Sequence, residues 1–163
     1  MHIYIKNKNL TINHYRIKCA IGKRGIGNKK EEGDNITPKG RFKIQSILYR
    51  KDRIYNFKSK IVKLSIKKNM GWCDDARSKH YNRLIRFPFN YGAEKLYRRD
   101  NIYDIILILN FNSNPIKRNK GSAIFIHIAK KNYQNTKGCV AVNKRNLKKI
   151  VKNINKNTIV HIN

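Results

Sequence analysis

Apolar and polar residues alternate along most of this chain. The alternation is clear at residues 3–5, 10–12 and 15–21. A period of two places successive side chains on opposite faces of a strand, so these segments predict half-buried strands. The same reasoning predicts further strands at 42–49, 61–66, 122–128 and 158–162. The segment 104–110 is continuously apolar between its two end residues, as expected of a central strand covered on both faces.

Only one helix is predicted. Asn143 can cap a helix whose apolar residues fall at helical spacing, at Leu147, Ile150, Val151 and Ile154. The glycine-rich segment 22–40 predicts a long loop. The 163 residues, 40% of them hydrophobic, suit one core without disulfides or metals. We therefore predict a single mainly β domain, residues 1–163, with one C-terminal helix.

The charge is strongly positive, with 38 Lys and Arg against 9 Asp and Glu and a formal net charge of +29. A field of this size favours polyanions, and a nucleic-acid-binding module is one hypothesis. The basic residues are nevertheless spread along the whole chain, as are many Asn and Ile residues. A codon bias toward AT-rich sequence explains this composition equally well, with the lysines simply solvated.

The sequence carries few signals of cellular location, bound metals or cofactors. The three cysteines, Cys19, Cys73 and Cys139, show no metal-binding or disulfide spacing, which fits a reducing compartment. The N-terminus lacks the apolar stretch of a secretory signal, and no apolar run approaches the ~18 residues of a membrane span. From the sequence alone we expect a cytoplasmic protein with no membrane segment, no metal and no cofactor; its oligomeric state is left open.

A histidine and a cysteine near the C-terminus are the best candidates for chemistry. His127 ends the run 122–127, and Cys139 follows twelve residues later. A thiol is a competent acyl-transfer nucleophile when a nearby base takes its proton, and Lys137 or a protonated His127 would favour the thiolate. Gly138 would let a carbonyl approach backbone amides. Taken alone, the same residues also fit a buried apolar cysteine and a satisfied core histidine.

A second motif upstream makes the pattern more specific. Residues 37–42 read T-P-K-G-R-F, and residues 136–140 read T-K-G-C-V after His127. Together they resemble the L,D-transpeptidase catalytic domain of the YkuD-like family. The resemblance implies a β-sandwich-like fold, a Cys139 nucleophile, a His127 general base, and backbone donors at Gly138 and Cys139. It also implies a peptidoglycan stem peptide as substrate and a place in the periplasm or cell envelope.

Several positions differ from the family pattern. Lys137 stands where many relatives have a second histidine, Ala141 replaces an Arg or Asn, and the interval from His127 to Cys139 is short. Two activities are open after the acyl-enzyme, transfer to an amine or hydrolysis. A degenerate member of the fold that only binds its ligand is a third hypothesis, beside the enzyme and the nucleic-acid module.

Further residues are predicted around the cleft. Thr136, Lys137 and Thr37 are candidate substrate contacts, and Trp72, in a segment expected to be a loop, is a candidate wall. Cys73, Asp74, Asp75 and His80 mix soft and hard ligands at no recognised zinc spacing, so a structural loop is preferred there. Cys19 is expected in the core. Glu31, Glu32 and Asp34 are expected to be solvated in a mobile loop.

Overall fold

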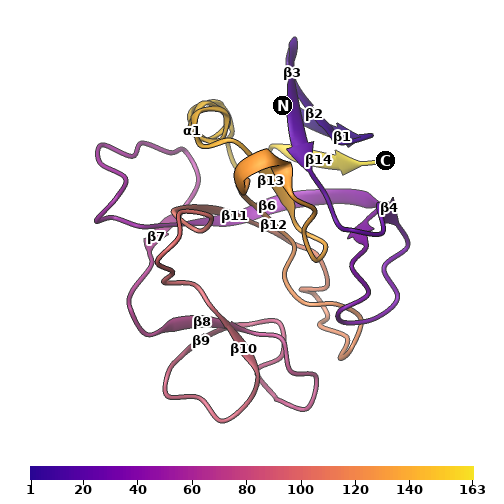
Figure 1. Ribbon diagram of the computed structural model, residues 1–163, viewed down its shortest axis with the longest axis vertical. Coiled ribbons are helices and arrows are strands. Elements are labelled where there is room, and N and C mark those ends of the chain that lie inside the picture. The colour runs from indigo at the N-terminus through magenta and orange to yellow at the C-terminus, as the bar shows by residue number, and fades with distance from the viewer.

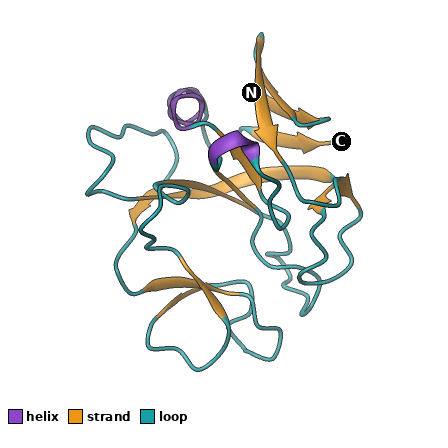
Figure 2. Cartoon of the chain, viewed as in Figure 1, coloured by secondary structure: helices purple, strands orange, loops and turns teal.

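The computed structural model describes all 163 residues (Figure 1). Strands and loops make up nearly all of the chain, with one α-helix and one short 3₁₀ turn (Figure 2). The elements are β1 His2–Lys6, β2 Asn9–Ile12, β3 Tyr15–Ala20, β4 Ile26–Gly27, β5 Thr37–Pro38, β6 Gly40–Tyr49, β7 Lys63–Ser65, β8 Met70–Cys73, β9 Leu84–Arg86, β10 Ala93–Lys95, β11 Ile105–Leu109, β12 Phe125–Ile128, η1 Lys131–Tyr133, β13 Val140–Val142, α1 Lys144–Asn153 and β14 Ile159–Ile162.

The main sheet has nine strands in the order β11-β12-β13-β3-β2-β1-β14-β6-β7. The long strand β6 also pairs with β11, so the sheet curls back on itself. Gly40–Lys43 of β6 pair with β14, and the second half of β6 pairs with β11. The first and last strands of the chain, β1 and β14, lie side by side and run parallel (Figure 1). The result is a β-sandwich-like fold, as predicted.

Two hydrophobic clusters lie on opposite faces of the central strands. Ile105, Leu107 and Leu109 of β11 belong to the larger cluster, which also takes in the apolar face of α1. Ile106 and Ile108 point the other way into the second cluster. This alternation confirms the prediction that the 104–110 run is a strand buried on both faces.

A small sheet covers the second cluster. Its strands are ordered β10-β8-β9, and it lies below the main sheet (Figure 1). Trp72 of β8 packs edge-on against Phe125 of β12, with ring centroids 5.5 Å apart. A loop was expected around Trp72, which is wrong for Met70–Cys73: these residues form a strand because β9 and β10 both pair with them.

The predicted helix is confirmed. Asn143 caps it, and its side-chain oxygen accepts a hydrogen bond of 2.8 Å from the amide of Asn146. Leu147, Ile150 and Val151 are buried as expected. The helix has ten residues, and the chain has no helix that is both long and apolar enough to cross a membrane.

The loop at residues 22–40 buries one of its acidic residues, contrary to the expectation that Asp34 is solvated, whereas Glu31 is exposed as expected. Asp34 is buried and pairs with Lys29 at 2.5 Å. Its carboxylate also accepts hydrogen bonds from the amides of Lys30, Glu31 and Ile36. Burial opposes ionisation, but these hydrogen bonds outweigh it and hold the pKa of Asp34 at about 2. These contacts hold the loop together from within, which matters because it supports the site.

Candidate functional site

The strand register places Cys139 and His127 on the same face of the main sheet. β12 and β13 run parallel, and His127 lies opposite Ala141. Cys139, two residues before Ala141, is therefore on the face of His127 and Phe125, one row away from the histidine. At the usual strand spacings, such diagonal neighbours have Cα atoms about 8 Å apart. The cysteine and histidine side chains can approach each other across this distance. The face they share is the one that holds the second hydrophobic cluster.

A network of hydroxyl hydrogen bonds fixes the turn before the cysteine. The Thr136 hydroxyl donates to the Cys139 carbonyl at 2.5 Å and accepts from the Gly138 amide at 3.1 Å. The Thr37 hydroxyl donates to the Gly138 carbonyl and accepts from the Gly22 amide, both at 2.8 Å. The ordered loop is thus fastened to the residue that precedes the nucleophile candidate.

Gly138 is needed for this turn. Its φ is +138°, and a Cβ at this position would lie 2.9 Å from the Ile36 carbonyl oxygen. The Gly138 amide is already engaged by Thr136, so the prediction of two oxyanion donors is corrected to one at rest. The amide of Cys139 makes no hydrogen bond within the protein and is the available donor.

The thiol of Cys139 is neutral at rest. Its sulfur accepts from the Phe125 amide at 3.4 Å, and it donates to the Ala123 carbonyl at 3.9 Å. Although the residue keeps some exposed surface, burial of the thiol raises its pKa to about 12. The expectation that Lys137 or a protonated His127 would lower this pKa is wrong, because desolvation dominates.

His127 is also neutral. The imidazole is buried, and burial lowers its pKa to about 4. Nδ1 lies 2.9 Å from the Ile128 carbonyl, which can only accept, so Nδ1 carries the proton and Nε2 has the free lone pair. The Tyr103 ring packs at a right angle against the imidazole and fixes its plane. The two ring centroids are 5.3 Å apart and the interplanar angle is 87°. A neutral imidazole of this tautomer can act as a base.

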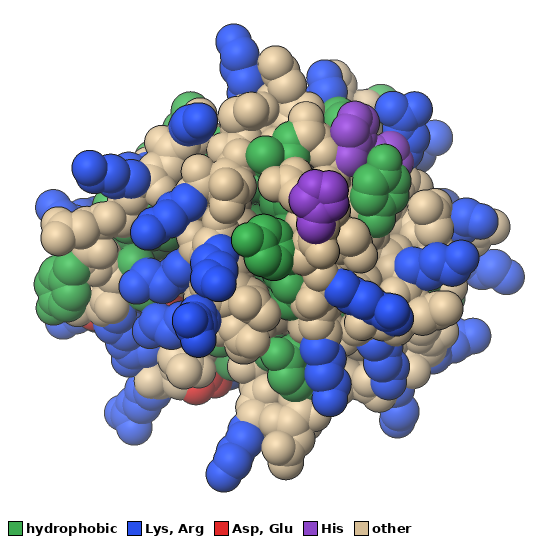
Figure 3. Space-filling model, turned by 90° about the horizontal axis from the view of Figure 1, so that it is seen from above, with side chains coloured by type: hydrophobic (Ala, Val, Ile, Leu, Met, Phe, Trp, Pro, Cys, Tyr) green, Lys and Arg blue, Asp and Glu red, His purple; other side chains and the backbone are tan.

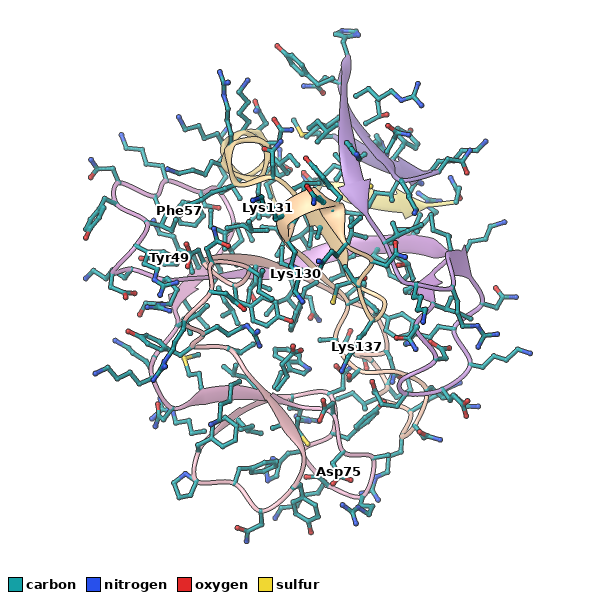
Figure 4. The ribbon with its side chains drawn as sticks, in the orientation of Figure 1. Tyr49, Phe57, Asp75, Lys130, Lys131 and Lys137 are labelled. Carbon is teal, nitrogen blue, oxygen red and sulfur yellow. The ribbon has the colours of Figure 1, made fainter.

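One cavity of about 380 Å³ contains both groups. Three cations line it, Arg98, Lys130 and Lys137, against a single carboxylate, Glu94. Lys130 and Lys137 lie close to the gap between the main sheet and the small sheet, while Asp75 lies farther out on the small-sheet side (Figure 4). The other lining residues are Ile102, Tyr103, His127, Gln134, Asn135, Thr136, Cys139 and Ala141.

The predicted site residues divide into three groups. Cys139, His127, Thr136 and Lys137 come together around the cavity. Thr37 is fully buried with its hydroxyl engaged, so the prediction that it contacts substrate is corrected to a role in positioning Gly138. Trp72 lines a different hollow.

That separate hollow corrects the prediction of a tryptophan wall. The Trp72 indole N–H donates to the Asn82 side chain at 3.0 Å, and the ring packs on Phe125 from below. Trp72 and Asn82 both line the other hollow and not the cavity with the thiol. In the same region Asp75 pairs with Arg77, as expected for a structural loop.

Two cavity residues were not found by sequence reasoning. Tyr103 is buried and donates a hydrogen bond of 2.8 Å to Glu94. Burial raises the pKa of Tyr103 far above its usual range. Both residues come from segments remote from the cysteine motif. The only available signal for Glu94 is an acidic residue inside a short β-like segment of a very basic chain.

The fold and the site define a class of protein: a β-sandwich-like domain with a cysteine and a neutral histidine in one cavity. The family follows from comparison. The sequence model of the L,D-transpeptidase catalytic domain, YkuD, matches residues 1–162, so the chain belongs to this family of cysteine-dependent transpeptidases. No curated protein sequence matches the chain.

Proposed function

We propose that this protein is a cysteine acyltransferase that acts on peptidoglycan stem peptides, by L,D-transpeptidation or by carboxypeptidase-type cleavage. The family implies this substrate. The observation that carries the proposal is the cavity that Cys139 and His127 share, with an unengaged Cys139 amide beside the sulfur. We take the whole chain, residues 1–163, as one catalytic domain.

The neutral resting pair determines the first step. His127 Nε2 takes the thiol proton as the sulfur attacks the carbonyl of the L-centred residue, so no preformed ion pair is needed. The Cys139 amide donates to the oxyanion. The C–N bond then breaks, the departing D-amino acid takes the proton from His127, and a thioester to Cys139 is left. An amine or a water molecule later releases the acyl group.

The charges of the cavity suit a substrate with carboxylates. Stem peptides carry several, and a positive cleft raises the rate of encounter and steadies a bound anion. Lys137 and Lys130 make no ion pair with any acidic side chain, so both are free for this purpose. Arg98 is already paired with Asp100 at 2.7 Å.

The test is a covalent adduct. We expect intact-mass measurement after incubation with a tetrapeptide stem, or with a carbapenem as a slowly released acyl donor, to show one adduct on Cys139. Cys139→Ala removes the sulfur and should show none, while Cys19→Ala, which alters a cysteine in the core, should keep it. A binding-only member of the fold would show no adduct at any pH, which would reject the enzyme.

A second candidate function is polyanion binding on the opposite side of the main sheet. A hollow of about 380 Å³ beside α1 is lined by five cations and no carboxylate. They are Lys58, Arg145, Lys148, Lys149 and Lys152, next to the exposed ring of Tyr55. Cations beside an exposed aromatic ring are typical of surfaces that bind single-stranded nucleic acid. Positive side chains are spread across the whole of the face seen in Figure 3, so a test must control for total charge.

Charge reversal at matched positions separates a site from a general field. We expect Lys148→Glu, Lys149→Glu and Lys152→Glu together to weaken binding of a single-stranded oligonucleotide at least tenfold more than the same three changes at Lys6, Lys39 and Lys68. Both variants carry the same net charge, and all six lysines are exposed. In the first variant the slope of log K against log salt concentration should also become shallower by about two units, because three phosphate contacts are lost. Equal weakening in both variants would leave only the general field.

A further inference from the structure

Glu94 is an unusual residue in the cavity. The chain has only 9 acidic residues against 38 Lys and Arg, and five of the acidic residues form ion pairs. Glu94 forms none, although Arg98, Lys130 and Lys137 line the same cavity. Arg98 and Lys137 act on Glu94 electrostatically, but neither contacts it directly, so its carboxylate is available to bind a cation from outside.

The small sheet directs Glu94 inward. In the β8–β10 pairing, Glu94 lies opposite Trp72, so the two side chains share one face. Trp72 packs on Phe125 of the main sheet, which identifies that face as the inner one. An apolar residue would be expected at such a position. Glu94 is nevertheless exposed, because it lies at the mouth of the cavity and not in the core.

Tyr103 fixes one oxygen of this carboxylate and leaves the other free. The Tyr103 hydroxyl donates to Oε1 of Glu94 at 2.8 Å, and no group in the protein binds Oε2. Tyr103 also contacts the His127 ring, so Glu94 is connected to the base through one side chain. Burial at its inner end raises the pKa of Glu94, although the side chain as a whole is exposed at the cavity mouth.

The charge of Glu94 is a disadvantage for the nucleophile. Burial is the main cause of the raised pKa of Cys139, and the negative charge of Glu94 adds to it. The residue therefore does not help the first acylation step. Its value must lie in a different step or with a different ligand.

We propose that Glu94, oriented by Tyr103, binds the ammonium group of the acyl acceptor and makes this site a transferase rather than a hydrolase. The inference rests on the proposed acyl-enzyme and names its second substrate as a primary amine that is protonated in solution. Lys130 and Lys137 would hold the carboxylates of the donor, while Glu94 attracts the one positive group that the reaction needs.

Aminolysis of the thioester conserves its bonds and protons. The ammonium bound by Glu94 gives one proton to His127 Nε2, and the resulting amine attacks the thioester carbonyl. The C–N bond forms, the C–S bond breaks, and the Cys139 sulfur leaves as a thiolate. The new amide nitrogen gives up its second proton to the thiolate, and His127 releases its proton to solvent. The products are an amide, the free thiol and one proton.

Binding can be measured without any turnover. Glycinamide carries one ammonium group, and acetamide lacks it. We expect glycinamide, titrated into the Cys139→Ala protein and followed by NMR, to bind at least tenfold more tightly than acetamide. Adding Glu94→Gln, which keeps an oxygen for Tyr103, should remove the difference. Glu31→Gln makes the same charge change at an exposed residue outside the cavity and should keep it.

The partition of the acyl-enzyme gives the second measurement. We expect the ratio of aminolysis to hydrolysis at a fixed glycinamide concentration to fall at least tenfold in Glu94→Gln, and less in Tyr103→Phe, which keeps the ring on His127. An unchanged ratio, or equal binding of glycinamide and acetamide, would overturn the role of Glu94. A wild-type protein that forms no acyl-enzyme would instead reject the proposed function, while the NMR titration would still decide whether Glu94 binds ammonium.

Discussion

Replacing Gly138 with alanine should lower acyl transfer by at least a hundredfold and destabilise the fold. The new Cβ would lie 2.9 Å from the Ile36 carbonyl oxygen, and the φ of +138° is rarely adopted by other residues. Strain and overpacking of this kind each cost about 1–3 kcal/mol. Relief requires the turn to move, and a shift of about 1 Å at a reacting group can cost a hundredfold in rate. Thermal unfolding and acyl-enzyme formation provide the two measurements.

Two other glycines are matched controls for this substitution. At Gly27 a Cβ would meet only the Ile36 side chain at 3.7 Å, an ordinary contact. At Gly33 the φ is +77° but no atom lies within 4 Å, so alanine there tests backbone strain without a clash. We expect Gly33→Ala to lose stability with its acylation rate preserved. If Gly138→Ala behaves like Gly33→Ala, the turn is not held as rigidly as the network with Thr37 and Thr136 requires.

Much of the fold was accessible from the sequence because its strands follow simple patterns. The alternation at 15–21 reflects burial on one face, and the apolar run at 104–110 reflects burial on two faces. The order of apolar and polar residues alone reveals both. The small sheet was missed because its strands are only three or four residues long, too short for an alternating pattern to show. Strands this short depend on pairing with one another and on tertiary packing, such as that of Trp72 on Phe125.

The site was predictable only where its residues are adjacent in sequence. The pair His127 and Cys139 follows from chemistry and a shared strand face, whereas their pKa values depend on burial that only the folded chain creates. Thr37 was predicted as a contact because the family resemblance places the loop that ends there beside the cleft, but tertiary packing directs its hydroxyl inward to the Gly138 carbonyl. Glu94 is placed at the cavity by β10 of the small sheet, which no sequence pattern predicted.

The resting protonation state can be tested at the thiol itself. With a pKa of about 12, Cys139 should react with iodoacetamide at pH 7 more slowly than a free thiol. The thiolate fraction is lower by about a thousandfold, and the greater nucleophilicity of a basic thiolate offsets part of this, which leaves a rate roughly 50-fold lower. The rate should rise with pH beyond 9 without a plateau near neutrality.

His127 should act only when a substrate is bound. We expect His127→Gln to reduce acyl transfer by about 10²–10⁴-fold, the usual value of a general base, and to leave the alkylation rate as it was. A thiolate and imidazolium pair would give the opposite result, with fast alkylation near neutral pH that slows when His127 is replaced. Comparing the two rates in one variant therefore distinguishes the two mechanisms.

The low pKa of His127 also affects stability. The folded chain keeps the ring neutral down to about pH 4, whereas the unfolded chain takes up a proton below its ordinary value of 6.5. Between these values the unfolded state binds more protons, so stability falls as the pH falls, by about 3 kcal/mol in all. We expect urea unfolding to show the full slope in the wild type and in His14→Gln, where the histidine is exposed, and only a small remainder in His127→Gln from His161, whose pKa is also lowered. An unchanged slope in His127→Gln would mean that the imidazole of His127 is not buried in its neutral form, and would contradict its role as a neutral general base.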